Sequence, residues 1–134
     1  MRAEKEAFMT RWYNELWNRG NEDIIDEMLH PECKAYGLGA EPFIGPAEFK
    51  YFYRAFKRDY SDINVVIERT LVDGNFAISI CIVSATYLPT DREVKFSGTS
   101  IAEIENGQLI NGWNHFDFLT LNMQTGKIKP EQLA

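Results

Sequence analysis

Hydrophobic residues in the first 60 positions recur every three or four residues, which is the spacing of one face of a helix. The pattern predicts a helix over residues 3–19 and a short second helix from residue 21 that ends at Pro31. A third helix is expected from Gly45 to about residue 60, with a proline at its first turn. Between the second and third helices, Glu32–Tyr36 is expected to form a short strand that leads into a glycine-bearing loop.

The second half of the chain changes to the pattern of β-strands. Four runs rich in β-branched and aromatic residues are separated by an Asp-Gly pair, a Leu-Pro-Thr-Asp turn and an Asn-Gly pair, which are typical of hairpins. These runs cover residues 63–72, 76–88, 94–104 and 109–119. Helices followed by long antiparallel strands predict an α+β fold, with the helices on one face of the sheet.

The run 76–88 carries apolar residues at both alternating positions, so both faces of this strand are expected to be covered. The three helices can cover only one face. We therefore expect the outer face of the sheet to contact a second copy of the chain in a two-fold dimer.

Composition narrows the class of protein. The 134 residues are expected to form one domain, 1–134, with a loose polar tail over 127–134. The formal net charge of −6 argues against a nucleic-acid partner, and no apolar run is long enough to span a membrane. The N-terminus has no signal-type stretch, so the protein is expected to be cytoplasmic. Cys33 and Cys81 have no metal-type spacing and are expected to be reduced core thiols.

The last run holds the residues with the most obvious chemistry. On a strand, Trp113, His115 and Asp117 share one face, and Asn114 and Phe116 share the other. An imidazole and a carboxylate on an otherwise apolar strand are costly unless they have partners or a function. Period 2 alone does not decide which of the two faces is turned inward.

Several motifs, in this order, resemble the SnoaL-like branch of the nuclear transport factor 2-like superfamily. They are Trp17-Asn18-Arg19-Gly20-Asn21, Leu29-His30-Pro31-Glu32, Gly45 at a helix start, Asp62 before the sheet, the ending Ile104–Trp113 followed by Asp117, and Gly126. The resemblance covers nearly all of the chain. It implies a cone, in which a strongly bent, mainly antiparallel sheet wraps around an apolar cavity closed by the first helices, usually as a dimer.

The resemblance also implies a site. In the polyketide cyclases of this family, the aspartate four residues after the tryptophan faces the cavity and acts as an acid/base in an aldol closure, a role that maps onto Asp117 beside Trp113. The stretch 84–92 departs from the cyclase pattern, because Tyr87 lies near where those enzymes carry a histidine and their glycines are absent. Similar folds perform isomerisation, dehydration and epoxide hydrolysis, so the fold does not define the reaction.

These arguments give a set of candidate site residues. In a dry pocket the pKa of Asp117 would be raised and the residue could transfer protons; the alternative is an aspartate that caps a turn or faces water. His115 is a candidate second proton carrier or a half-exposed histidine bonded to a neighbouring strand. Candidate cavity-lining residues are Trp113, Trp12, Tyr13, Tyr36, Tyr53, Phe56 and Tyr87, with core packing as the alternative for the aromatics outside the last strand.

Two functions follow from this set. The first is a small-molecule enzyme of the cyclase, isomerase or dehydratase type that uses Asp117 on a small apolar carbonyl compound. The second is a non-catalytic module that uses the same cavity for ligand binding or dimerisation. No metal cluster or phosphate loop occurs in the sequence, so neither a metal nor another cofactor is expected.

Overall fold

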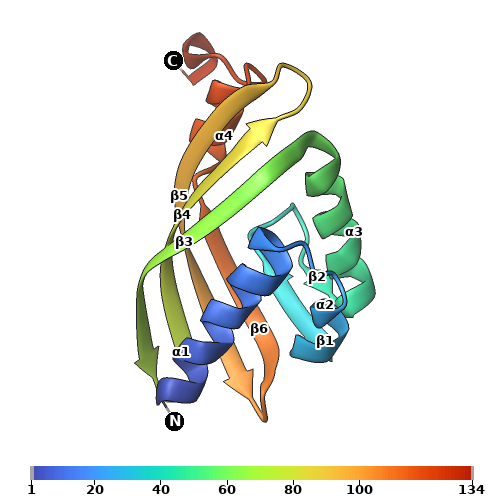
Figure 1. The fold of residues 1–134 in the computed structure, drawn as a ribbon, viewed down its shortest axis with the longest axis vertical. Helices are drawn as coiled ribbons and strands as arrows, with labels where there is room; N and C mark the ends of the chain where they lie inside the picture. Colours follow the sequence, from blue (N-terminus) through green and yellow to red (C-terminus); the bar gives the residue numbers. More distant parts are fainter. Residues whose placement is uncertain (1, 134) are drawn as a thin grey trace.

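A computed structural model of the chain describes residues 2–133 (Figure 1). The helical segments are α1 (Arg2–Arg11), the π-helix η1 (Trp12–Asn18), α2 (Ile24–Met28), α3 (Gly45–Asp59), α4 (Phe118–Gln124) and the 3₁₀-helix η2 (Pro130–Leu133). The strands are β1 (Leu29–Tyr36), β2 (Phe43–Ile44), β3 (Tyr60–Asp73), β4 (Phe76–Tyr87), β5 (Arg92–Glu105) and β6 (Gln108–Phe116).

The six strands form one mixed sheet in the order β2-β1-β6-β5-β4-β3. Every neighbouring pair is antiparallel except β1 and β6, which are parallel. The register shifts within the β3–β4, β5–β6 and β1–β6 pairs, and such bulges bend a sheet. In Figure 1 the bent sheet partly surrounds α1 and η1, and α3 lies beside β1. The α+β fold with helices packed on a bent, mainly antiparallel sheet is confirmed, and the sheet does not close into a barrel.

The first two helices differ in detail from the sequence prediction. The helix expected over 3–19 changes from α to π geometry at Trp12. The second helix ends at Met28, so the prediction that it runs to Pro31 is wrong. Leu29 is already extended, is 1% exposed and pairs with Leu109 on β6. Pro31 therefore lies within β1, where the register with β6 is interrupted and its missing N–H leaves no ladder bond unmade.

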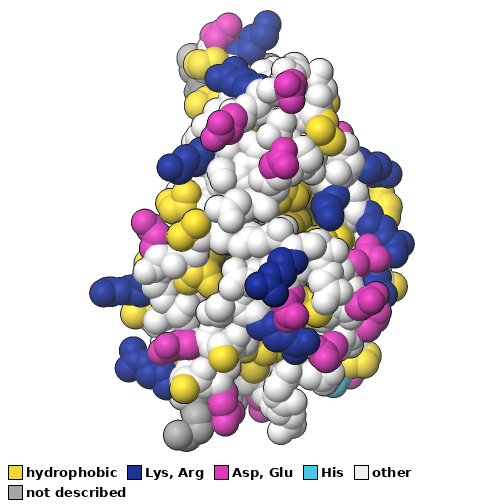
Figure 2. Space-filling view, in the orientation of Figure 1, with side chains coloured by type: hydrophobic (Ala, Val, Ile, Leu, Met, Phe, Trp, Pro, Cys, Tyr) yellow, Lys and Arg dark blue, Asp and Glu magenta, His cyan; other side chains and the backbone are white. Residues whose placement is uncertain are grey.

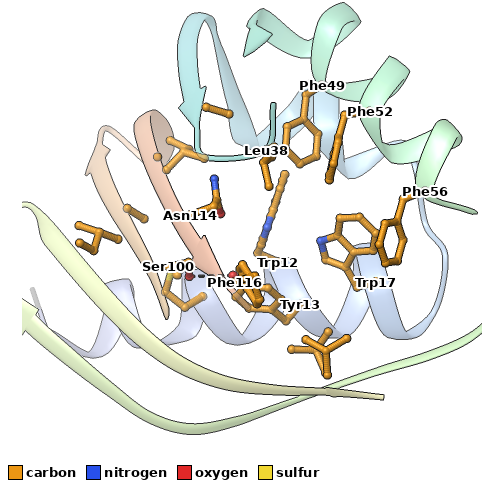
Figure 3. A pocket seen from close by; sticks show the side chains of 18 of the residues that line it. Trp12, Tyr13, Trp17, Leu38, Phe49, Phe52, Phe56, Ser100, Asn114 and Phe116 are labelled. Carbon is orange, nitrogen blue, oxygen red and sulfur yellow. Dashed lines mark hydrogen bonds between the residues drawn. The ribbon is translucent and has the colours of Figure 1, made fainter. Parts of the chain in front are cut away.

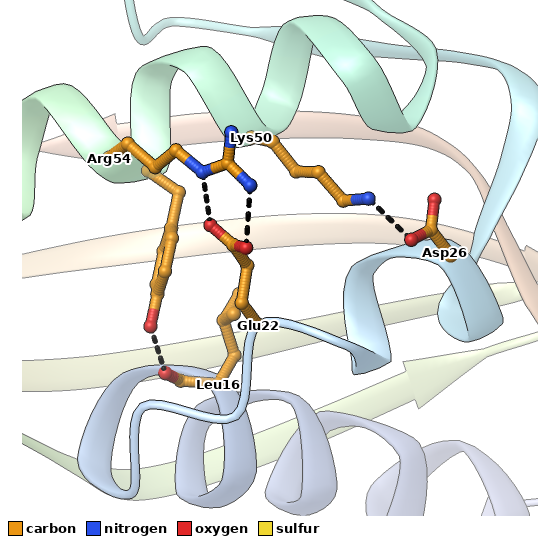
Figure 4. Close-up of polar contacts among 6 residues, drawn as sticks. Leu16, Glu22, Asp26, Lys50 and Arg54 are labelled. Carbon is orange, nitrogen blue, oxygen red and sulfur yellow. Dashed lines mark hydrogen bonds and ion pairs between the residues drawn. The ribbon is translucent and has the colours of Figure 1, made fainter.

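Polar contacts fasten α3 to the segment that contains η1 and α2 (Figure 4). The Arg54 guanidinium donates two hydrogen bonds to the Glu22 carboxylate, at 2.6 and 2.8 Å, and Lys50 pairs with Asp26. These ion pairs are largely exposed and each adds little to stability. The buried hydroxyl of Tyr53 donates to the Leu16 carbonyl at 2.9 Å, which fixes the position of α3 against η1.

The last predicted strand is shorter than expected because the chain turns into α4 after Phe116. Asp117 is the N-cap residue of α4 and accepts hydrogen bonds from the backbone N–H and the hydroxyl of Thr120, at 2.9 and 2.6 Å. At the other end of α4, the Gln124 amide bonds to both the N–H and the carbonyl of Lys95, each at 2.8 Å. The Asp117 N–H donates to the Ser97 carbonyl of β5 at 2.9 Å, so α4 is attached to the sheet at both of its ends.

The two faces of the sheet have different surroundings. The inner face, turned toward α1, η1 and α3, belongs to the buried core, where Cys33 and Cys81 are free thiols as expected. We define the outer face as the opposite side, on which Val66, Leu71, Phe76 and Ile80 are 51, 43, 38 and 37% exposed. None of the helices within residues 2–133 has the length and apolar character needed to span a membrane.

Candidate functional site

A cavity lies between the helices and the inner face of the sheet (Figure 3). Its volume is about 80 Å³, counted as the space that the centre of a water molecule can occupy. This is several times what one water needs. The lining side chains come from α1, η1, α3, β1 and the loop after it, all four long strands and α4, and most of them are aromatic or aliphatic. In Figure 2, hydrophobic side chains are visible in a hollow between β3 and α3.

Aromatic rings from η1, α3 and β6 line this cavity. Trp12 packs against Phe49 with ring centroids 5.3 Å apart, and Trp17 packs edge-on against Phe56 at 5.7 Å. Phe116 contributes from β6. The helical spacing in η1 and α3 turns these rings toward the sheet, so a ligand in the cavity would contact flat apolar surfaces.

A row of polar side chains crosses the otherwise apolar inner face. Thr70, Ser79, Ser100 and Asn114 are paired in register across β3, β4, β5 and β6, so they stand side by side. The hydroxyls of Thr70 and Ser79 are 3.1 Å apart and bond to each other. Ser100 and Asn114 line the cavity, and Tyr13 reaches this row from η1.

The hydroxyl of Tyr13 donates a hydrogen bond to Oγ of Ser100 at 2.7 Å, and both residues are buried. Burial raises the pKa of Tyr13, and the neighbouring Cys81 thiol raises it further. The phenol is therefore neutral at physiological pH. It acts here as a hydrogen-bonding group and not as a base.

The amide of Asn114 has a fixed orientation. Its Nδ2 donates to the backbone carbonyl of Tyr36 at 3.0 Å, and only the nitrogen end of an amide can donate to a carbonyl. The Oδ1 end is thereby left as an acceptor on a side chain that points into the cavity (Figure 3).

The prediction that Trp113, His115 and Asp117 face the cavity is wrong. The register of β6 pairs Gly112 with Ala102 and Asn114 with Ser100, both on the inner face, so the three residues lie on the other side. The outer face accommodates Trp113 at little cost, because its ring stacks on Tyr36 at 6.0 Å and packs on Phe76 at 6.2 Å. His115 and Asp117 are exposed to solvent.

The expected raised pKa of Asp117 is also wrong. The two hydrogen bonds from Thr120, side chain first and backbone second, stabilise the carboxylate and lower its pKa. The alternative considered from the sequence, an aspartate that caps a turn and faces water, describes its position. A carboxylate of this kind is ionised at neutral pH and is a poor proton donor.

His115 and Asp117 do share a shallow, open hollow on the outer face, which we call the outer hollow. It also includes Ser97, Thr99 and Ile80. Within the described residues, no three His, Cys, Asp or Glu side chains are grouped so that they could hold a metal ion.

The aromatic candidates divide into two groups. Trp12, Tyr13 and Phe56 line the cavity, as expected. The hydroxyl of Tyr53 donates its hydrogen bond to the Leu16 carbonyl, and Tyr36 lies on the outer face. The ring of Tyr87 packs against that of Tyr60, with centroids 5.3 Å apart, and Lys127 lies over it. These last three residues, expected in the cavity, do not line it.

Sequence reasoning missed Ser100, Asn114 and Phe116 as cavity residues, although one signal was available. Gly98 lies in the middle of β5, and a glycine inside a strand often marks the close approach of another group. A Cβ added at Gly98 would be 2.2 Å from the Phe116 ring, so the glycine makes room for an inward-pointing phenylalanine. Recognising this would have assigned the inner face of β6 to Asn114 and Phe116.

Comparison with known proteins identifies the family. A family model for SnoaL-like polyketide cyclases matches residues 7–125, and the chain belongs to this family. Among solved structures, TsrD from Streptomyces laurentii is 21% identical with a TM-score of 0.83, over 96% of this chain and 98% of that chain. A candidate SnoaL-like polyketide cyclase from Jannaschia sp. CCS1 is 17% identical with a TM-score of 0.82, over 91% of both chains.

AclR from Streptomyces galilaeus, a candidate hydroxylase, is 16% identical with a TM-score of 0.82, over 95% of this chain and 83% of that chain. No curated protein matches the chain. At these identities the similarity to solved structures shows the shared fold and no particular activity.

Proposed function

We propose that this protein binds a small, largely apolar molecule in the cavity. The observation that carries the proposal is a partly open cavity lined by aromatic rings, with a few polar groups on one side, which is the usual composition of a small-molecule site. Rings such as Trp12 and Phe116 supply apolar contact area, and burying that area away from water provides the driving force.

The lining supports binding better than proton transfer. Among the described residues, the cavity lining contains no carboxylate, imidazole or amine, and the phenol of Tyr13 has a raised pKa. An acid or base must be within hydrogen-bond reach of the proton that it moves. Chemistry inside this cavity would therefore depend on neutral hydrogen-bonding groups.

Isothermal titration with 2-naphthol, a two-ring probe of suitable size and polarity, tests the proposal. Ala102 lines the cavity, so Ala102→Leu directs extra volume into it and should weaken binding by at least about tenfold. Ala47→Leu, on the exposed surface of α3, is the matched control and should bind like the wild type. If 2-naphthol fails to bind, or binds Ala102→Leu and the wild type equally, the cavity is not the binding site.

A second candidate function is a cofactor-independent acid/base enzyme of the cyclase, isomerase or dehydratase type. Membership of the polyketide cyclase family supports it, and Asp117 and His115 meet in the outer hollow. Asp117→Asn keeps an oxygen that can cap α4 and removes the ionisable group. An enzyme that uses Asp117 would lose turnover in this variant without unfolding, whereas a binding protein would show no turnover in either form.

We also propose that the outer face mediates a homodimer. The exposed side chains of Val66, Leu71, Phe76 and Ile80 gather on this face, and apolar patches of this kind typically mark interaction surfaces. A two-fold dimer would bury the same patch from both copies. Such a dimer would cover the outer face of β4, whose apolar residues occupy both alternating positions.

Light scattering at micromolar concentration tests the dimer. Ile80→Glu places a charge on the outer face and should yield the mass of one chain, because burying an unpaired carboxylate is costly. Tyr51→Glu is the control, since Tyr51 is 69% exposed on α3, away from the sheet. A wild-type mass of 15.5 kDa would contradict the proposal.

A further inference from the structure

We propose that the ligand carries a hydroxyl group that binds between Ser100 and Asn114. The inference rests on the proposed binding function and adds the chemical class of the ligand, an apolar alcohol or phenol. It follows from two groups that face the cavity, the Ser100 hydroxyl with an unused hydrogen and the Asn114 amide with an unused oxygen.

Ser100 supplies a free donor. Its oxygen accepts from Tyr13 at 2.7 Å, and among residues 2–133 no further side-chain hydrogen bond involves it. A hydroxyl has one hydrogen to donate, and here that hydrogen has no acceptor in the described part of the chain. The residue is 5% exposed and lines the cavity, so a ligand atom is the natural partner.

Asn114 supplies a free acceptor. Its Nδ2 is committed to the Tyr36 carbonyl at 3.0 Å, which leaves Oδ1 for another donor. No N–H or O–H of the described residues bonds to that oxygen. The side chain is half-buried, so a ligand that covers Oδ1 without donating to it would leave this acceptor without a partner, and a ligand that donates to it is favoured.

The two groups are close enough to share one ligand atom. Ser100 and Asn114 are directly paired on β5 and β6, and Cβ atoms of such pairs are about 4.5–5.5 Å apart. A hydroxyl placed between them can accept from Ser100 and donate to Asn114 at ordinary hydrogen-bond lengths. A ketone or ether oxygen can only accept, and a hydrocarbon can do neither, so both would leave Oδ1 unpaired.

A series of three probes with one ring system tests this on the wild-type protein. We expect 2-naphthol to bind about tenfold more tightly than naphthalene, from the two added hydrogen bonds. We expect 2-methoxynaphthalene, which accepts but cannot donate, to bind more weakly than 2-naphthol. Dissociation constants from isothermal titration give the two ratios.

Two variants assign the effect to the proposed residues. Ser100→Ala removes the donor and should reduce the 2-naphthol to naphthalene ratio severalfold toward one. Ser79→Ala is the matched control, because Ser79 is the neighbour of Ser100 on β4, is fully buried, bonds to Thr70 and does not line the cavity. Its ratio should equal that of the wild type.

The outcomes separate the inference from the proposed function. If naphthalene and 2-naphthol bind equally well, or if Ser79→Ala lowers the ratio as much as Ser100→Ala, the inference is wrong while binding in the cavity stands. If 2-methoxynaphthalene binds as well as 2-naphthol, the donation to Asn114 is wrong. If none of the three binds, the proposed function fails and the inference fails with it. The three probes are compared on the wild-type protein, so this comparison tests the inference even if a variant does not fold.

Discussion

Replacing Gly98 with alanine should destabilise the protein, because the Phe116 ring occupies the space where a side chain would lie. An added Cβ would be 2.2 Å from Cδ1, 2.5 Å from Cγ and 2.8 Å from Cα of Phe116. The contact with Cα involves backbone, so a change of rotamer cannot relieve all of it. The strands β5 and β6 would have to separate locally.

The size of the effect follows from two opposing contributions. Overpacking of a core typically costs about 1–3 kcal/mol. Replacing a strand glycine by alanine stabilises the fold by about 0.5–1 kcal/mol, because glycine loses more backbone entropy on folding than other residues. The net loss in the free energy of unfolding for Gly98→Ala should be about 1–2 kcal/mol, which corresponds to a fall in Tm of about 5 °C.

Gly112→Ala is the matched control. Gly112 lies on the inner face of the neighbouring strand, and an added Cβ there would meet Leu109 at 3.7 Å, an ordinary contact. This variant should be as stable as the wild type or about 0.5–1 kcal/mol more stable. Urea denaturation followed by circular dichroism at one fixed protein concentration measures both variants, since any dimer makes stability concentration-dependent.

A double-mutant cycle identifies the residue responsible. In a Phe116→Ala background, Gly98→Ala should cost less than it does alone, by about 1 kcal/mol, because the ring contacts are gone. If Gly98→Ala is as stable as Gly112→Ala and shows no coupling to position 116, then Phe116 does not point inward. In that case the sequence expectation that β6 presents Asp117 to the cavity would be restored.

Three further predictions concern ionisation and hydrogen bonding. The capping bonds lower the pKa of Asp117, so its carboxylate stabilises the fold at pH values above the ordinary pKa of 3.8. This stability is lost as the pH falls through the lower pKa of the folded state. The Tm should therefore fall more steeply on acidification for the wild type than for Asp117→Asn. Burial raises the pKa of Cys33 to about 12 and that of Cys81 to about 11. Both thiols should therefore not react with a disulfide reagent at pH 8 until urea unfolds the chain, and fast labelling of the native protein would contradict their buried positions. Tyr13→Phe should lower the free energy of unfolding by about 1 kcal/mol through the lost bond to Ser100, and an unchanged urea midpoint would show that this bond is not made.

The sequence pattern predicted most of the elements and the fold class. Helical spacing identified α3 within one residue of its end, and the Asp-Gly and Asn-Gly pairs marked two hairpins at Gly74 and Gly107, where φ is positive. The family resemblance, confirmed by the match over residues 7–125, supplied the arrangement of helices around a cavity. Helices and tight turns depend on a few neighbouring residues, so a single sequence is enough to predict them.

Helix α4 was missed for a local reason. Phe118, Leu119 and Leu121 continue the apolar character of β6, so the run 109–119 read as one strand. An aspartate before an apolar run is a typical N-cap signal, and Asp117 occupies that position in front of Phe118. The family resemblance implies a role in the cavity for the same aspartate, which conflicts with its role as a cap.

The site could not be predicted because it depends on register. Alternation divides β6 into two faces, but it does not assign the inner one when apolar residues occupy both. The polar row that contains Ser100 and Asn114 comes from four strands, and their alignment depends on turn lengths and on the bulge between Ile67 and Arg69. The pairing of strands that are far apart in the sequence cannot be predicted from the pattern of residues within any one strand.

A crystal structure of the protein with 2-naphthol bound tests the central claim most directly. The account predicts the two rings inside the cavity, against Trp12 and Phe116, with the hydroxyl oxygen within hydrogen-bond distance of both Ser100 Oγ and Asn114 Oδ1. The probe bound in the outer hollow beside His115 and Asp117, with the cavity empty, would contradict it.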